Sequence, residues 1–300
     1  MTAPMPTPTR ARAWLLAARV RTLPAAVAPV LVGSAAAYRA HGLAWLPALA
    51  AICGAIAIQI GANFANDVYD AEKGADGPNR VGPPRAVASG WISASAMKSA
   101  MIAVFALAML IGGYLTAHAG WPVVAIGLAS IAAGIAYTGG PYPLGYNGLG
   151  DIFVFLFFGP VAVLGTMYVQ LHRFDWVAVL ASIGVGALAT AILVVNNLRD
   201  ADTDVAVGKR TVVVRFGKRF AYGEYVAMLV LAAGVAVAMS VWLHHAGPMV
   251  SMAVAPLAVR RYRQLRAAHA GPVFNGLLAA TAQVLLFYSL LLTVGIALTR

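Results

Sequence analysis

The fold of this chain is decided by Asn63-Phe-Ala-Asn66-Asp67-Val-Tyr-Asp70-Ala-Glu72-Lys73-Gly74-Ala-Asp76, which ends a long apolar run. A second stretch of the same kind is Asn196-Asn197-Leu-Arg199-Asp200-Ala-Asp202-Thr-Asp204, followed by Gly208-Lys209-Arg210-Thr211. The first acid stretch (63–76) holds four of the ten acidic residues in the chain, and the second acid stretch (196–211) holds three. Carboxylates at the end of a membrane-spanning run are costly and usually functional. The two stretches therefore predict one polar site at one face of a membrane.

The composition indicates a polytopic membrane protein. Of the 300 residues, 61% are hydrophobic and only 10% are charged, which exceeds the apolar share of a soluble domain. The net charge of +11 is compatible with nucleic-acid binding, but the basic residues are dispersed among short loops, where membrane orientation explains them better. We therefore expect no nucleic-acid partner. Cys53 is the only cysteine, which excludes a disulfide within the chain.

Apolar windows of membrane-spanning length recur along the chain. They predict an all-α bundle of nine transmembrane helices, forming one domain over residues 15–300 after a disordered tail over 1–14. The windows are 22–38, 46–64, 99–117, 122–138, 152–171, 176–196, 221–243, 247–260 and 275–298.

The distribution of Lys and Arg predicts the orientation, because cytoplasmic loops carry the excess of basic residues. Eighteen of the 21 lie in the N-terminal segment or in loops on its side of the membrane. The opposite side keeps only Arg39, Arg173 and Arg300. We therefore expect a cytoplasmic N-terminus, an outside C-terminus, and both acid stretches at the cytoplasmic face.

Each acid stretch presents its oxygen ligands on one helix face. In the first stretch the spacing i, i+3, i+4, i+7 joins Asn63, Asn66, Asp67 and Asp70, and in the second the spacing i, i+4, i+8 joins Asn196, Asp200 and Asp204. Carboxylate and amide oxygens suit Mg²⁺, which usually completes its shell with water and substrate phosphate. The alternative to a metal site is that these residues are helix caps and solvated loop acids. Two matched clusters favour the metal site instead.

The surroundings of the acids indicate a lipid diphosphate as substrate. Cationic side chains that could neutralise phosphate follow both stretches, namely Lys73, Arg80, Arg85, Arg199, Lys209 and Arg210. With an allylic diphosphate, metal and cations stabilise the charge on the departing pyrophosphate, so that the carbon–oxygen bond breaks toward a carbocation. An electron-rich acceptor then attacks.

Two other classes of membrane protein could also contain clusters of acidic residues. A divalent-cation transporter would need ionisable groups along a route through the bilayer, whereas the acids here gather at one face. A phospholipid-synthesising phosphotransferase would keep its acids in a single motif. The paired Gly112-Gly113 and the many small residues of the spans predict close helix packing.

Asn66-Asp67-Val-Tyr-Asp70 and Asp200-Ala-Asp-Thr-Asp204 resemble the paired motifs of the UbiA superfamily of intramembrane prenyltransferases. Within it, Arg80-Val-Gly-Pro-Pro-Arg85, Ala88-Ser89-Gly90 and Gly208-Lys209-Arg210-Thr211 resemble the branch that prenylates 1,4-dihydroxy-2-naphthoate in menaquinone synthesis. The resemblance implies transfer of a polyprenyl group to that acceptor with decarboxylation, in the inner membrane of a bacterial cell. Prenylation of another aromatic acceptor, such as 4-hydroxybenzoate, is the alternative.

The resemblance also implies residue roles. Two Mg²⁺ ions are expected, one on Asn66, Asp67 and Asp70, the other on Asp200 and Asp204, with Asp76 and Asn197 as supporting ligands. Substrate binding is expected from Lys73, Arg85, Arg199, Lys209, Arg210, Tyr137, Tyr142 and Asn63.

The loop from Tyr137 to Asp151 bears on the acceptor. The 4-hydroxybenzoate branch usually has a basic residue shortly after a tyrosine there, and this loop has none, which disfavours that acceptor. Tyr137, Tyr142 and Tyr146 fit an acceptor pocket and equally fit an interfacial tyrosine belt. Prenyl chain length, oligomeric state, the partner of the acceptor carboxylate and any general base are left unassigned.

Overall fold

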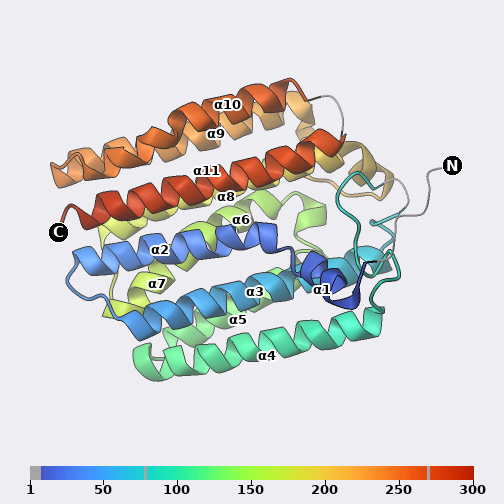
Figure 1. Ribbon diagram of the computed structural model, residues 1–300, viewed down its shortest axis with the longest axis horizontal. Helices are drawn as coiled ribbons and strands as arrows, with labels where there is room; N and C mark the ends of the chain where they lie inside the picture. Colours follow the sequence, from blue (N-terminus) through green and yellow to red (C-terminus); the bar gives the residue numbers. More distant parts are fainter. Residues whose placement is uncertain (1–7, 78–79, 269–270) are drawn as a thin grey trace.

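The computed structural model describes residues 8–77, 80–268 and 271–300, and every regular element in these ranges is helical (Figure 1). The all-α prediction is confirmed. In chain order the elements are α1 (Arg10–Ala18), η1 (Val20–Thr22), α2 (Leu23–Arg39), α3 (Trp45–Glu72), α4 (Ala94–Ala119), α5 (Pro122–Ala136), η2 (Gly145–Asn147), α6 (Gly150–Leu156), η3 (Phe157–Val161), α7 (Ala162–Leu171), α8 (Trp176–Ala206), α9 (Val212–Leu243), η4 (Gly247–Val254), α10 (Ala255–Arg266) and α11 (Gly271–Ala297).

The long helices run side by side along one axis of the molecule (Figure 1). In the described residues, seven segments are long and apolar enough to cross a membrane, namely Arg10–Arg39, Trp45–Glu72, Ala94–Ala119, Gly150–Leu171, Trp176–Ala206, Val212–Leu243 and Val273–Ala297. The shorter α5 is also apolar, and η4 continues directly into α10. All nine predicted windows therefore fall on helical segments.

The start of the chain differs from the prediction of a tail over residues 1–14. Helix α1 begins at Arg10, because the Thr9 hydroxyl accepts a hydrogen bond from the Arg12 backbone N–H at 3.4 Å and caps it. The ring of Trp14 meets Phe64 of α3 edge-on, with centroids 5.7 Å apart. The earlier part of the predicted tail, residues 1–7, lies outside the described residues. Helix α1 therefore packs beside the first acid stretch.

Helix α8 is the centre of the bundle. Most of its apolar window is buried, and it packs against α9, α11 and α6. Small residues allow this closeness: a Cβ on Gly159 would lie 2.6 Å from the Ser182 carbonyl oxygen of α8. The second acid stretch therefore ends the most enclosed of the seven long segments.

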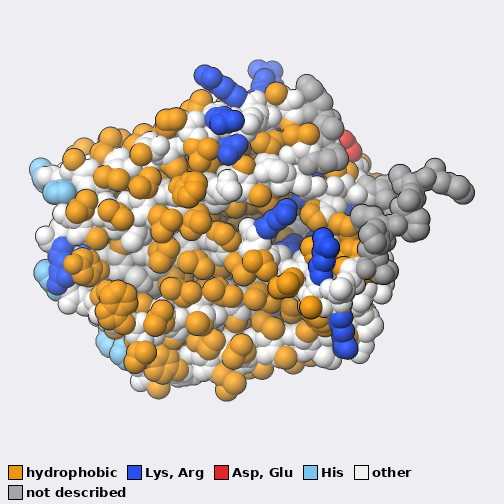
Figure 2. All heavy atoms as spheres, viewed as in Figure 1, with side chains coloured by type: hydrophobic (Ala, Val, Ile, Leu, Met, Phe, Trp, Pro, Cys, Tyr) orange, Lys and Arg blue, Asp and Glu red, His pale blue; other side chains and the backbone are white. Residues whose placement is uncertain are grey.

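The outer surface is that of a protein embedded in lipid (Figure 2). Hydrophobic side chains cover the middle of the visible face, most visible Lys and Arg lie on the side of the N-terminus or over α10, and His lies at the opposite end. An apolar band between polar ends matches the hydrocarbon layer of a bilayer.

Candidate active site

The two acid stretches meet at the same end of the bundle, and Lys209 joins them. Its Nζ lies 3.8 Å from Asp70 Oδ1 at the end of α3 and 3.5 Å from Asp204 Oδ1 near the end of α8. Both carboxylates are buried. Lys209 reaches this position because Gly208, with φ of 74°, turns the chain just after α8, and the Lys209 backbone N–H returns to the Asp204 carbonyl at 2.9 Å. The prediction that both stretches form one site agrees with this geometry.

Tyr146 of η2 closes the same cluster. Its hydroxyl donates to Asp70 Oδ1 at 2.8 Å, and the ammonium groups of Lys73 and Lys209 lie 4.8 and 4.6 Å from its ring centroid. Its carbonyl accepts the Arg210 backbone N–H at 2.7 Å, which ties the two loops together. Burial raises the pKa of Tyr146, so the neutral hydroxyl persists as a donor.

In the first acid stretch, side chains also hold neighbouring segments. Asp67, only 1% exposed, accepts backbone N–H groups of Ala86 at 3.2 Å and Val87 at 2.9 Å. The amide oxygen of Asn66 accepts the Thr138 hydroxyl at 2.9 Å. The carboxylate of Asp67 and the amide of Asn66 therefore fix the loops that follow α3 and α5.

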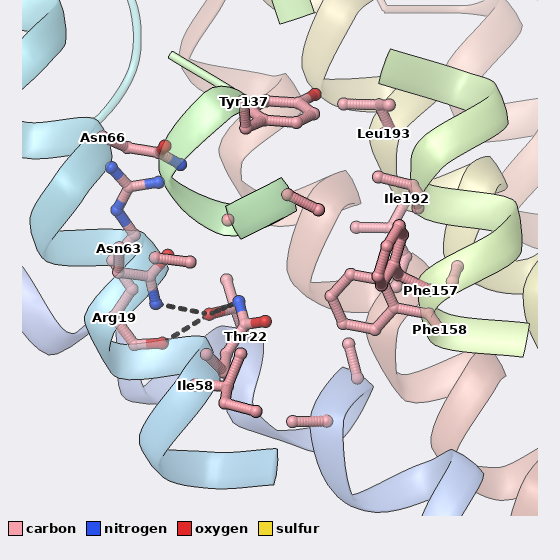
Figure 3. Close-up of a pocket in the computed structure, with 18 of the residues that line it drawn as sticks. Arg19, Thr22, Ile58, Asn63, Asn66, Tyr137, Phe157, Phe158, Ile192 and Leu193 are labelled. Atoms are coloured by element: carbon pink, nitrogen blue, oxygen red, sulfur yellow. Dashed lines mark hydrogen bonds between the residues drawn. The ribbon is translucent and has the colours of Figure 1, made fainter. Parts of the chain in front are cut away.

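Asn63 lines the cavity, its contact with substrate stays a prediction, and its amide also has structural partners. Its amide donates to the Ala18 carbonyl at 3.0 Å and to the Thr22 hydroxyl at 3.3 Å, and that hydroxyl donates to the Arg19 carbonyl at 2.9 Å (Figure 3). These bonds satisfy backbone groups where the chain reverses between α1 and α2. Asn63 therefore positions this turn at the cavity wall.

Asp76 has basic partners, and its role as a supporting metal ligand stays a prediction. Its buried carboxylate pairs with Arg80 and lies 3.4 Å from Arg85 Nε, and it is outside the set of residues that line the cavity. Burial raises its pKa to about 6, and Arg80 opposes this shift. Arg80 and Arg85, which follow α3 in the chain, thus both contact Asp76. Arg85 Nη2 also lies 3.3 Å from Asp70 Oδ2.

In the second acid stretch, one guanidinium organises the polar groups. Arg199 donates to both oxygens of Asp200 at 2.7 and 2.6 Å, to Asn196 at 2.8 Å and to Asn275 of α11 at 3.1 Å. Such a fork on a carboxylate fixes orientation as well as charge. Arg199 therefore aligns Asp200 and joins α8 to α11.

A cavity of about 980 Å³ extends from this polar cluster into the bundle. Tyr137, Phe157, Phe158, Ile192 and Leu193 lie along one side of it, opposite Arg19, Asn63 and Asn66 (Figure 3). Phe157 and Phe158 belong to the π-helical turn η3, which contains Pro160. Pro160 cannot donate the regular helical hydrogen bond, and such turns alter which side chains face inward. The cavity is therefore polar at one end and aromatic and aliphatic beyond it.

Most predicted site residues line this cavity, and four do not. The lining residues are Asn63, Asn66, Asp67, Asp70, Arg85, Tyr137, Asn197, Arg199, Asp200, Asp204 and Lys209. Outside the lining are Asp76, Lys73, whose ammonium donates to the Thr138 carbonyl, the exposed Arg210, and Tyr142, which is 60% exposed. Of the three loop tyrosines, Tyr137 and Tyr146 line the cavity.

Arg19 and Asn275 line the cavity and are missing from the predicted site. Arg19 ends α1 in the left-handed conformation, with φ of 50°, and its guanidinium lies beside Asn66 (Figure 3). Its buried Nη2, like Arg85 Nη1, has no hydrogen-bond partner among the described residues. Two buried guanidinium nitrogens are therefore available to an anion. In the sequence, the only indication of a role for Arg19 was its basic side chain near the start of the chain. Nothing in the sequence indicated a role for Asn275.

The donor set fits Mg²⁺ that is completed by a substrate. Among the described residues, no three of His, Cys, Asp and Glu converge closely enough to hold a metal alone. Mg²⁺ is usually held by one or two carboxylates together with water and phosphate oxygens. Asp70 and Asp204 already share one cationic partner, so each stretch offers a carboxylate to a cation in the space between them.

Comparison with known proteins gives a consistent family. The model of the UbiA prenyltransferase family matches residues 26–272. The chain is 39% identical over 280 residues to a 1,4-dihydroxy-2-naphthoate octaprenyltransferase of Mycobacterium tuberculosis, covering 92% of this chain and 94% of that protein. It is 38% identical over 299 residues to the protein of the same name in Escherichia coli, covering 97% of each.

Solved structures agree in fold. A UbiA homolog from Aeropyrum pernix superposes with a TM-score of 0.71 at 15% identity, covering 91% of this chain and 97% of that one. A UbiA homolog from Archaeoglobus fulgidus, bound to DMAPP and Mg²⁺, gives 0.66 at 13% identity, covering 94% and 99%. From its sequence and its fold alike, this chain belongs to the UbiA prenyltransferase family.

Proposed function

We propose that this chain transfers a polyprenyl group from an allylic polyprenyl diphosphate to 1,4-dihydroxy-2-naphthoate. The products are demethylmenaquinol, pyrophosphate and carbon dioxide. The names of relatives that match nearly its whole length support this acceptor, and the absence of a basic residue in the loop from Tyr137 to Asp151 disfavours 4-hydroxybenzoate.

The observation that carries this proposal is the convergence of Asp70 and Asp204 on Lys209 at the mouth of a largely apolar cavity. An acid pair alone would suit many phosphate substrates. A deep, largely apolar cavity directly behind it fits a substrate with a diphosphate at one end and a long apolar tail.

In the donor complex, the carboxylates of both stretches would hold Mg²⁺, which neutralises the charge that develops on pyrophosphate as the carbon–oxygen bond breaks. Lys209, Arg19 Nη2 and Arg85 Nη1 would bind the remaining phosphate oxygens. The electron pair of the broken bond leaves with pyrophosphate. The electron-rich ring then attacks the allylic carbon, and the acceptor carboxylate departs as carbon dioxide.

We further propose nine membrane crossings in one domain over residues 15–300, with α1 packed at its start. The seven long segments, α5, and the continuous η4–α10 make up the nine. The charge distribution supports a cytoplasmic N-terminus, an outside C-terminus and an active site facing the cytoplasm of a bacterial cell. Such an enzyme would bind its polyprenyl diphosphate donor from the lipid bilayer.

The test is a turnover assay on purified protein in lipid nanodiscs with a polyprenyl diphosphate and Mg²⁺. Three reactions are compared: 1,4-dihydroxy-2-naphthoate, 4-hydroxybenzoate and no acceptor, each with an EDTA control. We expect EDTA-sensitive prenylation of the naphthoate alone, with pyrophosphate and carbon dioxide released. Prenylation of 4-hydroxybenzoate instead would show that the proposed acceptor is wrong. Mg²⁺ flux in liposomes without any prenylated product would show that the proposed enzymatic activity is wrong.

A further inference from the structure

The deep part of the cavity lies far below the acid stretches. Its far end is lined by Ala51, Leu115, Val123 and Val169, from four different helices. Ala51 and Asp67 both lie on α3, about 24 Å apart at the rise of an α-helix. An extended isoprene unit adds four chain bonds, about 5 Å. The cavity is therefore deep enough for roughly five isoprene units in line.

Four helical glycines line this deep part: Gly54 of α3, Gly112 of α4, Gly127 of α5 and Gly165 of α7. Gly54 and Gly112 lie at the same depth, because a Cβ on Gly54 would stand 3.5 Å from Ile111. Gly165 and Gly127 are related in the same way, through Ile126 at 3.6 Å. Glycine within a helix costs about 1 kcal/mol relative to alanine. Four of them around one space need a physical reason.

Helix packing does not supply that reason. At the packing glycines of this protein a Cβ would clash: on Gly33 it would lie 2.5 Å from the Val163 carbonyl oxygen, and on Gly61 2.6 Å from the Phe105 ring. At Gly112 and Gly127 it would meet no described atom within 4 Å. The prediction of close packing at Gly112-Gly113 is therefore incorrect, and the missing side chains leave open cavity instead.

We propose that Gly54, Gly112, Gly127 and Gly165 keep the deep cavity open for isoprene units of a long donor that lie beyond about the fourth. This inference rests on the proposed function. Gly54 stands about 20 Å below Asp67, which leaves room for roughly four units above the level of the glycines. Donors longer than this must pass between them, whereas shorter donors do not reach them.

Adjacent residues on α4 provide a matched test. Gly112 lines the cavity, whereas Gly113 is exposed on the outer side of the helix, and neither position would crowd a neighbour. Gly112→Leu and Gly113→Leu therefore gain similar helix propensity, but only the former places a branched side chain in the path of the donor. Gly165→Leu on α7 repeats the test from a different helix.

The measurement is kcat/KM with geranyl diphosphate, which has two isoprene units, and with octaprenyl diphosphate, which has eight. For Gly112→Leu and Gly165→Leu we expect the ratio of the octaprenyl to the geranyl value to fall by about tenfold or more, because several buried carbons lose their place. Gly113→Leu should keep the wild-type ratio. Retained geranyl turnover also shows that each variant is folded.

An unchanged ratio in both cavity variants, or an equal loss for both donors, would overturn the proposal, because distal units would then not pass the glycines. Failure of the proposed function is distinguished from this result by the wild type. In that case, the unaltered protein would prenylate the naphthoate with neither donor.

Discussion

The two acid stretches are similar as sequences but differ in how the fold uses them. In the first, Asp67 is bound to two backbone N–H groups of a distant loop, and Asp70 is bound to Tyr146 and Arg85. In the second, Asp200 is held by the adjacent Arg199. The first stretch therefore combines site chemistry with the folding of the loops, whereas the second is supported mainly from its own helix. Matching motifs need not have matching energetic roles.

The largest expected effect falls on both stretches equally. Asp70→Ala and Asp204→Ala should each lower kcat by about two to three orders of magnitude, because each removes a carboxylate facing the cation between the helices. Steady-state prenylation with saturating Mg²⁺ and saturating concentrations of both substrates measures this. Asp202→Ala is the control, since that side chain is 90% exposed and should keep wild-type turnover. Normal rates in either site variant would refute the metal assignment.

A comparison of Asp67→Ala with Asp200→Ala tests whether the two acid stretches differ in their contribution to stability. Both should lose turnover, but only Asp67→Ala removes the shared acceptor of two backbone N–H groups of a separate loop, that of the buried Ala86 and that of the part-buried Val87. We expect it to lower the free energy of unfolding by about 2–4 kcal/mol, since hydrogen bonds to a charged group contribute more than neutral ones. Unfolding in detergent, followed by intrinsic fluorescence, measures the difference. Equal stability of the two variants would contradict the double role.

Among the basic residues, Arg85→Ala should raise the KM for the donor by about tenfold, because Nη1 is a buried donor in the cavity. Arg210→Ala should leave KM within about twofold of wild type, because its exposed side chain lies outside the lining. Donor titrations at fixed naphthoate provide both values. A larger effect at Arg210 would mean that the loop closes over the substrate.

The smallest effect is expected in the tyrosine loop. Tyr146→Phe removes one hydrogen bond to Asp70. It should reduce kcat by about fivefold, because a typical hydrogen bond has a net free energy of about 1 kcal/mol. Tyr142→Phe should change nothing, since this ring is 60% exposed. The pair is compared in one steady-state assay. An effect at Tyr142 equal to that at Tyr146 would place the acceptor nearer the surface than the cavity indicates.

Hydrophobic length and helical spacing predicted the parts of this structure that depend on local sequence. The apolar windows coincide with helical segments, and the spacing of Asp67, Asp70, Asp200 and Asp204 correctly joined residues that line one cavity. Both signals are strong because a bilayer excludes charge and requires satisfied backbone groups. For such features, one sequence is sufficient.

Features that depend on loops and tertiary contacts could not be predicted. Arg19 enters the cavity because α1 ends with a left-handed residue, which no periodicity reports. Asp76 forms ion pairs with Arg80 and Arg85 because the loop folds back on it. Gly112 differs from Gly113 only in which side of α4 each occupies. In each of these cases, the position in space distinguishes residues of the same type.

The packing of α1 has a practical consequence for handling the protein. Arg12, Leu15, Leu16 and Arg19 of the initial segment line the cavity, and the C-terminus lies at the far end of the bundle (Figure 1). Affinity tags, fluorescent fusions and surface tethers belong at the C-terminus, where they keep clear of the substrate. Fusions that cut into the first turns, however convenient for purification, would remove part of the cavity wall.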